Sequence, residues 1–159
     1  MKASSFFTTK NSIGYVAERF QPVFGDMDIE LPKKLDLQTK KLDRPMTDAE
    51  ILKKFDPEEI SLGDLVYAIK NIFERIRWRW YICYIRDDAG VLWAVGAYWR
   101  EGHGWFVSAS SVGRPNGWNA VHQVVSRKFS ALGTSDTGSF DLGTLEISVG
   151  GKRYKLVEV

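Results

Sequence analysis

The chain has 159 residues, of which 44% are hydrophobic and 13% aromatic, so it can build the core of one domain. A formal net charge of +2 is too small to indicate a class of partner, and the single cysteine, Cys83, excludes an intramolecular disulfide. No apolar run approaches the roughly 20 residues of a membrane span, and the N-terminus lacks the apolar centre of a signal peptide. We therefore expect a cytoplasmic protein that does not bind a membrane.

The first segment, residues 1–46, shows no sustained hydrophobic periodicity. Acidic and apolar residues alternate over residues 26–31, which is typical of an edge strand or an extended peptide. Lys-Lys-Leu-Asp then occurs twice, at 33–36 and 40–43, in a charged stretch flanked by prolines. The pattern predicts an extended arm or solvated linker over residues 1–46, followed by a single domain over residues 47–159.

Two helices are predicted next, each from its start signal. Thr-Asp-Ala-Glu at residues 47–50 is a capping box, and Pro57 ends the short helix that follows. Ser-Leu-Gly-Asp at 61–64 is a second capping signal, and the apolar residues after it recur at intervals of three and one. This spacing predicts an amphipathic helix over residues 62–76 with one face against a sheet.

The aromatic-rich stretch 78–106 predicts three antiparallel strands. It contains five of the six tryptophans, and its apolar runs are separated by Asp-Asp-Ala-Gly at 87–90 and Glu-Gly-His-Gly at 101–104. Such four-residue polar and glycine-containing segments are typical of tight hairpin turns. Both faces of this meander are rather apolar. One face can pack on the helix 62–76, and the other is either covered by another element or is a binding surface.

The segment 118–129 permits two interpretations. Ala120, Val121, Val124 and Val125 fit one face of a short helix, which we favour, whereas alternation over residues 123–128 fits a strand.

Several runs in this half of the chain also carry a resemblance. They are Asp-Asp-Ala-Gly-Val-Leu-Trp-Ala at 87–94, Ser-Ala-Ser-Ser-Val-Gly at 108–113 and Gln-Val-Val-Ser-Arg at 123–127. Over about residues 78–129 the chain resembles small uncharacterised proteins from candidate-phylum bacteria. The resemblance implies no activity and no site residues, and it favours a strand at 123–127.

The C-terminal residues predict a second hairpin, with Gly150 and Gly151 in a primed turn. The expected register pairs Ile147 with Tyr154, Leu145 with Leu156 and Glu146 with Lys155. The predicted fold is therefore α+β. An antiparallel sheet, made of the aromatic meander and this hairpin, packs on one main amphipathic helix.

Arginine and tryptophan concentrate in the meander and the segment after it. Residues 77–128 carry seven Lys or Arg against three Asp or Glu. Exposed aromatic rings can stack on bases, and arginine can contact phosphates. The candidate residues for binding nucleic acid or a protein partner are Arg77, Arg79, Trp80, Trp99, Arg100, Trp105, Arg114, Trp118 and Arg127. A tryptophan-rich core sheet with arginines at its ends would account for the same residues.

No catalytic, metal-binding or cofactor motif is present, so we favour a non-enzymatic binding module without cofactor or metal. Cys83 is expected to be a buried, inert thiol. One alternative is an enzyme that gathers His103, His122 and Asp87 from loops. Another is a small inhibitor or accessory subunit that docks through the arm at residues 1–46.

Overall fold

The computed structural model describes residues 1–129 and the strands at 146–149 and 152–155. Its helices are α1 (Ala3–Phe6), the 3-10 helix η1 (Thr9–Asn11), α2 (Phe20–Phe24), α3 (Asp48–Phe55) and α4 (Leu62–Asn71). Its strands are β1 (Ile13–Val16), β2 (Gln38–Lys41), β3 (Trp80–Arg86), β4 (Leu92–Arg100), β5 (Gly104–Ser111), β6 (His122–Ser126), β7 (Glu146–Val149) and β8 (Lys152–Lys155). Within these described parts, no helix has both the length and the apolar character needed to cross a membrane.

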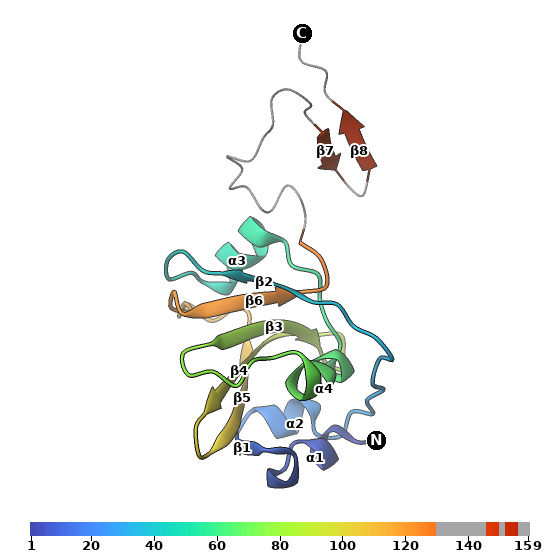
Figure 1. Ribbon diagram of the computed structural model, residues 1–159, viewed down its shortest axis with the longest axis vertical. Coiled ribbons are helices and arrows are strands. Elements are labelled where there is room, and N and C mark those ends of the chain that lie inside the picture. The colour runs from blue at the N-terminus through green and yellow to red at the C-terminus, as the bar shows by residue number, and fades with distance from the viewer. Residues whose placement is uncertain (130–145, 150–151, 156–159) are drawn as a thin grey trace.

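A six-stranded sheet in the order β1-β5-β4-β3-β6-β2 organises the protein (Figure 1). Its centre is the predicted meander, because β4 pairs antiparallel with both β3 and β5. β1 pairs parallel with β5, and β6 pairs parallel with β3. The sheet is therefore mixed, not purely antiparallel as predicted, although β2 does pair antiparallel with β6. The predicted C-terminal hairpin is not part of it, because β7 and β8 form a separate two-stranded sheet. Parallel partners need long crossovers, which leave no local turn signal in the sequence.

One face of the sheet carries the larger core. Helices α1, α2 and α4 pack on it, and the residues of β3, β4 and β5 that point toward them include Cys83, Val95 and Trp105. Cys83 is buried as predicted, and burial raises the pKa of its thiol. We call this the helix-covered face.

Among the residues that the structure describes, the opposite face is covered only in part. Ile51 and Phe55 of α3 pack over Ile82 and Val124 of the two strands beneath them. Trp118, from the loop before β6, adds to this second core cluster. Over β4 and β5 this open face carries half-buried residues, and its rings are described below.

Residues 1–46 do not form an extended arm. They supply both edge strands, β1 and β2, and the fully buried side chains of Phe20 and Phe24 fill the helix-covered face. Leu42 and Met46 enter the core of the other face. The prediction was wrong because very short helices and strands do not repeat an apolar period long enough to detect.

Helix α4 starts at the predicted capping box but ends early, at Asn71. Phe73 leaves the helical path to stack on Tyr81, with ring centroids 3.9 Å apart and planes 7° from parallel. The Tyr81 hydroxyl accepts a hydrogen bond from the Glu74 N–H at 3.0 Å. Tertiary packing thus overrides the helical pattern of residues 72–76.

The two remaining predictions concern residues 118–129 and the C-terminus. The favoured helix at 118–129 was wrong: residues 122–126 form β6, held between β3 and β2. The C-terminal hairpin is confirmed where it is described, since Ile147 pairs with Tyr154 and Glu146 with Lys155. The expected pair of Leu145 and Leu156 lies outside the described residues.

Phe20→Ala tests whether the N-terminal segment belongs to the domain. We expect the free energy of unfolding to fall by about 3–5 kcal/mol, because Phe20 is fully buried and its loss leaves a cavity. Leu31→Ala, in the same segment but exposed, is the control and should change that free energy by less than about 0.5 kcal/mol. Urea unfolding measures both. Equal values would mean that residues 1–46 do not stabilise the fold.

Candidate functional site

Six aromatic side chains form a row across the open face of the sheet, one from each neighbouring strand and one from a loop. In spatial order they are Tyr15 (β1), Phe106 (β5), Tyr98 (β4), Trp80 (β3), His122 (β6) and Trp118. Neighbouring ring centroids lie 4.9 to 5.3 Å apart. The spacing follows from the sheet, because adjacent strands lie about 4.8 Å apart. We call this set the aromatic row.

The row has an accessible part and a buried part. Tyr15 is 53% exposed, and Phe106, Tyr98 and Trp80 are half-buried. These four rings are tilted from their neighbours by only 32° to 37°. His122 and Trp118 are buried and meet their neighbours edge-on. The first four rings are therefore tilted against one another, whereas the last two meet their neighbours edge-on.

Arginines lie beside the rings. The guanidinium carbon of Arg100 is 5.2 Å from the Phe106 ring centroid, and that of Arg114 is 4.3 Å from the Trp118 centroid. Arg77 lies 4.8 Å from the ring of Trp78, which precedes the row. Within residues 1–129, neither Arg77 nor Arg100 forms an ion pair. Their charges are thus available to an anion.

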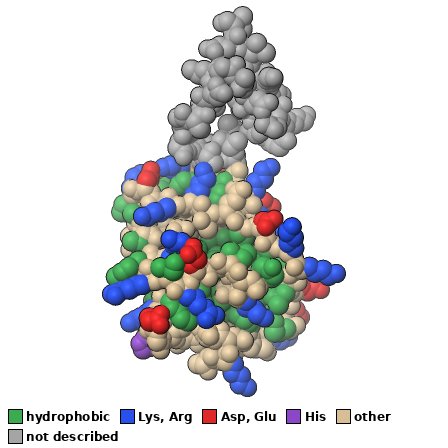
Figure 2. Space-filling view, viewed as in Figure 1, with side chains coloured by type: hydrophobic (Ala, Val, Ile, Leu, Met, Phe, Trp, Pro, Cys, Tyr) green, Lys and Arg blue, Asp and Glu red, His purple; other side chains and the backbone are tan. Residues whose placement is uncertain are grey.

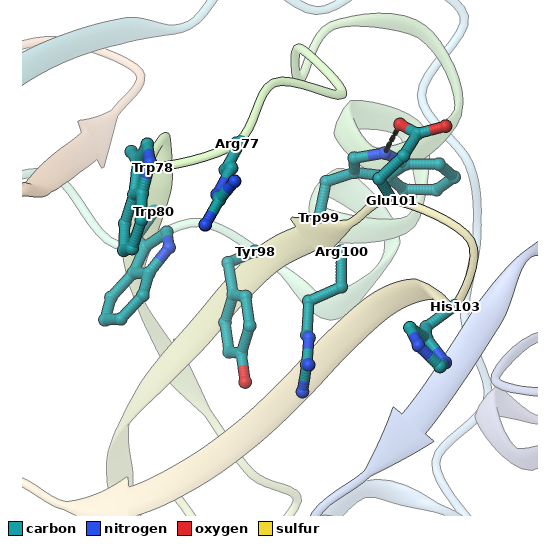
Figure 3. A pocket seen from close by; sticks show the side chains of 8 residues that line it. All are labelled: Arg77, Trp78, Trp80, Tyr98, Trp99, Arg100, Glu101 and His103. Carbon is teal, nitrogen blue, oxygen red and sulfur yellow. Dashed lines mark hydrogen bonds between the residues drawn. The ribbon is translucent and has the colours of Figure 1, made fainter.

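A cavity of about 450 Å³ opens at the end of the sheet where Trp80 and Tyr98 lie (Figure 3). Trp80, Tyr98 and Arg100 project to one side of the strands, whereas Trp99 projects to the other. The lining residues are Arg77, Trp78, Trp80, Tyr98, Trp99, Arg100, Glu101 and His103. We call this space the arginine cavity. It combines aromatic walls with two cations and one carboxylate, and that carboxylate accepts a hydrogen bond from Trp99 Nε1 at 3.2 Å.

A second cavity, of about 330 Å³, adjoins the first on the far side of Trp80 and Tyr98. Gly96 lies in its floor, beneath the ring of Trp118. A Cβ at Gly96 would lie 3.5 Å from that ring and 3.0 Å from the Ser108 hydroxyl. The missing side chain therefore lets Trp118 approach the sheet and end the row.

A buried carboxylate anchors Trp118. Asp48, at the start of α3, is fully buried, and its Oδ1 accepts hydrogen bonds from Trp118 Nε1 at 2.7 Å and from the Tyr84 hydroxyl at 2.8 Å. Burial raises the pKa of Asp48, while the two hydrogen bonds and the charge of Arg114 act in the opposite direction. The Asp48 Oδ2 lies 4.0 Å from Arg114 Nε. This cluster connects α3 to the buried end of the aromatic row.

His122 is buried between Trp80 and Trp118. Its Nδ1 lies 2.8 Å from the side-chain oxygen of Asn119 and 3.2 Å from that residue's carbonyl oxygen, so Nδ1 carries the ring hydrogen. Burial lowers the pKa of His122, the hydrogen bond to Asn119 raises it, and the charge of Arg114 lowers it. His122 therefore completes the row as a neutral ring at neutral pH.

The structure places some of the candidate residues predicted from the sequence at these two cavities and others elsewhere. Arg77, Trp80 and Arg100 line the arginine cavity, Trp118 lines the adjoining one, and Arg114 lies over Trp118. Trp99 lines the arginine cavity too, but its ring belongs to the helix-covered face, against Arg75 and Trp105.

Three candidates lie outside the site. Trp105 is fully buried in the helix-covered core. Arg79 pairs with Glu74, and Arg127 pairs with Asp64 at 2.7 Å. Burial removes Trp105 from any binding face, whereas the two arginines lie outside the aromatic row with carboxylates as partners.

Five aromatic residues of the site were not among the candidates for binding: Tyr15, Trp78, Tyr98, Phe106 and His122, the last considered only for the enzyme alternative. Tyr98 and Phe106 could have been found, because the two hairpin turns place Tyr98 opposite Trp80 and Phe106 opposite Tyr98. Trp78 precedes the strand, and Tyr15 comes from a segment without a recognisable pattern. Its place in the row depends on the parallel pairing with β5.

The arrangement offers stacking surfaces and cations, and it does not bring together the three residues of the enzyme alternative. Asp87 and His103 lie at opposite ends of β4, whose nine residues span roughly 30 Å, so they cannot share a site. Asp87 also accepts hydrogen bonds from Trp93 Nε1 and from its own turn. Within the described residues, no three His, Cys, Asp or Glu side chains gather as metal ligands would.

Comparisons with protein-family models, with curated proteins and with solved structures find no match to this chain. The function is therefore inferred from the geometry of the site itself.

Asp48→Ala tests the anchor of Trp118. Removing the carboxylate leaves the Trp118 N–H and the Tyr84 hydroxyl buried without an acceptor, so we expect the free energy of unfolding to fall by about 2–4 kcal/mol. Asp48→Asn keeps an acceptor oxygen and should cost clearly less. Urea unfolding, with the near-ultraviolet circular dichroism of the tryptophans as a local signal, compares the two. Equal losses would contradict the proposed anchoring.

His122→Gln tests the pH dependence of the row. The pKa of His122 is lower in the folded state than the ordinary 6.5, so the unfolded chain binds more protons and stability is lost as pH falls below about 6.5. Asp48, whose pKa is raised, has the opposite effect. The difference in unfolding free energy between wild type and His122→Gln, measured from pH 7.5 to pH 5, should therefore shrink on acidification. A constant difference would show that His122 is not the titrating group.

Proposed function

We propose that this protein binds single-stranded nucleic acid, with bases stacked on the exposed part of the aromatic row and phosphates held by the adjacent arginines. The observation that carries this proposal is the row itself. Four accessible rings from four neighbouring strands lie about 5 Å apart with similar tilts. Every base has an aromatic face, so a series of such rings can accept successive unpaired bases without reading their sequence.

The charges beside the row favour an anionic strand over a protein partner. Arg77 and Arg100 form no ion pair within residues 1–129, and Glu101 is engaged by Trp99. Figure 2 shows basic side chains dispersed over the visible surface with acidic ones among them, so long-range attraction is modest. Affinity would thus come from stacking plus a few phosphate contacts rather than from a large basic patch.

An unpaired strand fits this surface better than a duplex. Bases in a duplex are stacked on each other and paired, so their faces cannot reach rings on a sheet. Proteins that read a duplex insert a helix or a two-stranded ribbon into its major groove, whereas the aromatic row lies on the face of a sheet. We therefore expect single strands to be preferred.

The two alternatives from the sequence have less support. An inhibitor or accessory subunit that docks through an N-terminal arm would need residues 1–46 to be free, but their Phe20, Phe24 and Leu42 are buried. An enzyme using His103, His122 and Asp87 would need these side chains together, and the length of β4 separates Asp87 from His103. A protein partner on the same rings remains one outcome of the experiment below.

Tyr98→Ala and Arg100→Ala test the proposal. Loss of one stacking ring should weaken binding of a labelled single-stranded oligonucleotide by roughly 5- to 150-fold, equivalent to about 1–3 kcal/mol. Loss of one phosphate contact should weaken binding and reduce the slope of log affinity against log salt by about 0.7. Fluorescence anisotropy at two salt concentrations measures both quantities.

Arg86→Ala is the matched arginine control, because Arg86 pairs with Glu59 at the other end of β3. It should leave the affinity unchanged. Salt-independent binding, or equal effects of Arg86→Ala and Arg100→Ala, would contradict the proposal. If wild-type protein fails to bind oligonucleotides at low salt, the row would be an interface for a protein.

A further inference from the structure

Trp78 has an unusual backbone conformation. Its φ is +71°, in the left-handed region that a bulky side chain rarely adopts. It occupies the third position of a turn closed by a hydrogen bond from the Arg79 N–H to the Ile76 carbonyl at 3.2 Å. Turns that need a positive φ at this position usually have glycine there. The fold therefore keeps a tryptophan where glycine would be less strained.

The strain is not compensated by burial of the ring. Trp78 is 60% exposed, and its ring lies 6.4 Å from that of Trp80 with a 27° angle between the planes. The strained turn thus holds the ring out at the mouth of the arginine cavity. Residues held in sparsely populated backbone conformations cluster at active sites and ligand clamps.

The chemistry of this cavity matches one nucleotide. Trp78, Trp80 and Tyr98 provide aromatic surface, and Arg77 and Arg100 line the same cavity on either side of Tyr98 in the view of Figure 3. A volume of about 450 Å³ is within the range of small-ligand sites. An apolar ligand would leave the two guanidinium groups unused, and a cationic ligand would be repelled by them.

We infer that Trp78 is a clamp for one unpaired nucleotide, whose base stacks on the Trp78 ring inside the arginine cavity while its phosphate binds Arg77 and Arg100. The choice of a nucleotide as occupant rests on the proposed function. The clamp adds a defined site for one base and one phosphate to a surface that otherwise accepts bases without distinction. A free mononucleotide should bind there weakly by itself.

Trp78→Gly and Trp78→Ala test this clamp as a pair, because both remove the ring but glycine alone tolerates the positive φ. We expect both to weaken binding of the labelled single strand by roughly 5- to 150-fold. We expect Trp78→Gly to have the higher Tm of the two, by about 2–6 °C. A Trp78→Gly protein that is less stable than Trp78→Ala would show that the turn is unstrained and overturn the argument.

Titration with adenosine 5′-monophosphate and with adenosine, followed by tryptophan fluorescence, tests the cavity directly. Wild type should bind the monophosphate more tightly than the nucleoside, and Arg77→Ala should reduce that difference. If the strand binds wild type and both Trp78 variants within twofold, the clamp is wrong and the aromatic row stands. If wild type binds no strand but loses its monophosphate response in Trp78→Gly, the proposed function fails and the clamp stands as a mononucleotide site. If wild type binds neither probe, both are wrong.

Discussion

The packing of α1, α2 and α4 on one face of the six-stranded sheet is the constraint on which the other features depend. These helices bury the larger core on that face. Because burial of apolar surface is the main source of stability, the opposite face needs to contribute less of it. Because side chains alternate along each strand, every residue committed to the core leaves its neighbour on the open face. Trp105 and Phe106 show the result: the first is fully buried, and the second belongs to the aromatic row.

Buried hydrogen bonds fix the position of the rings at one end of the aromatic row. Asp48 accepts hydrogen bonds from both Trp118 and Tyr84, and His122 is held by Asn119. These bonds hold two buried rings at one end of the row, where His122 packs between Trp80 and Trp118. Burying the charged form of Asp48 costs free energy of folding, which is why burial raises its pKa. Asp48 is the first residue of α3, so its hydrogen bonds connect that helix to the site.

The parts predictable from the sequence were those defined by local signals. Both capping boxes, the two meander turns and the register of the C-terminal hairpin depend on residues a few positions apart, and the structure contains all of them. The parallel strands β1 and β6, the packing of residues 1–46 and the early end of α4 depend on distant partners. The site divides in the same way. Trp80 and Arg100 come from the meander, whereas Tyr15 joins them through a pairing that no local pattern indicates.

The pairing of β1 with β5 also has a consequence for how the chain folds. Ile13 of β1 pairs with Trp105 of β5, and β2 pairs with β6. Both edge strands therefore find their partners only after most of the described chain has been synthesised. Contacts so distant in sequence are slow to form, because loop closure must precede the gain from packing. During that interval the meander has unpaired strand edges and exposed aromatic residues, which are the conditions for association with other chains. Nascent chains of this protein should therefore depend on protection from aggregation until their first strand is in place.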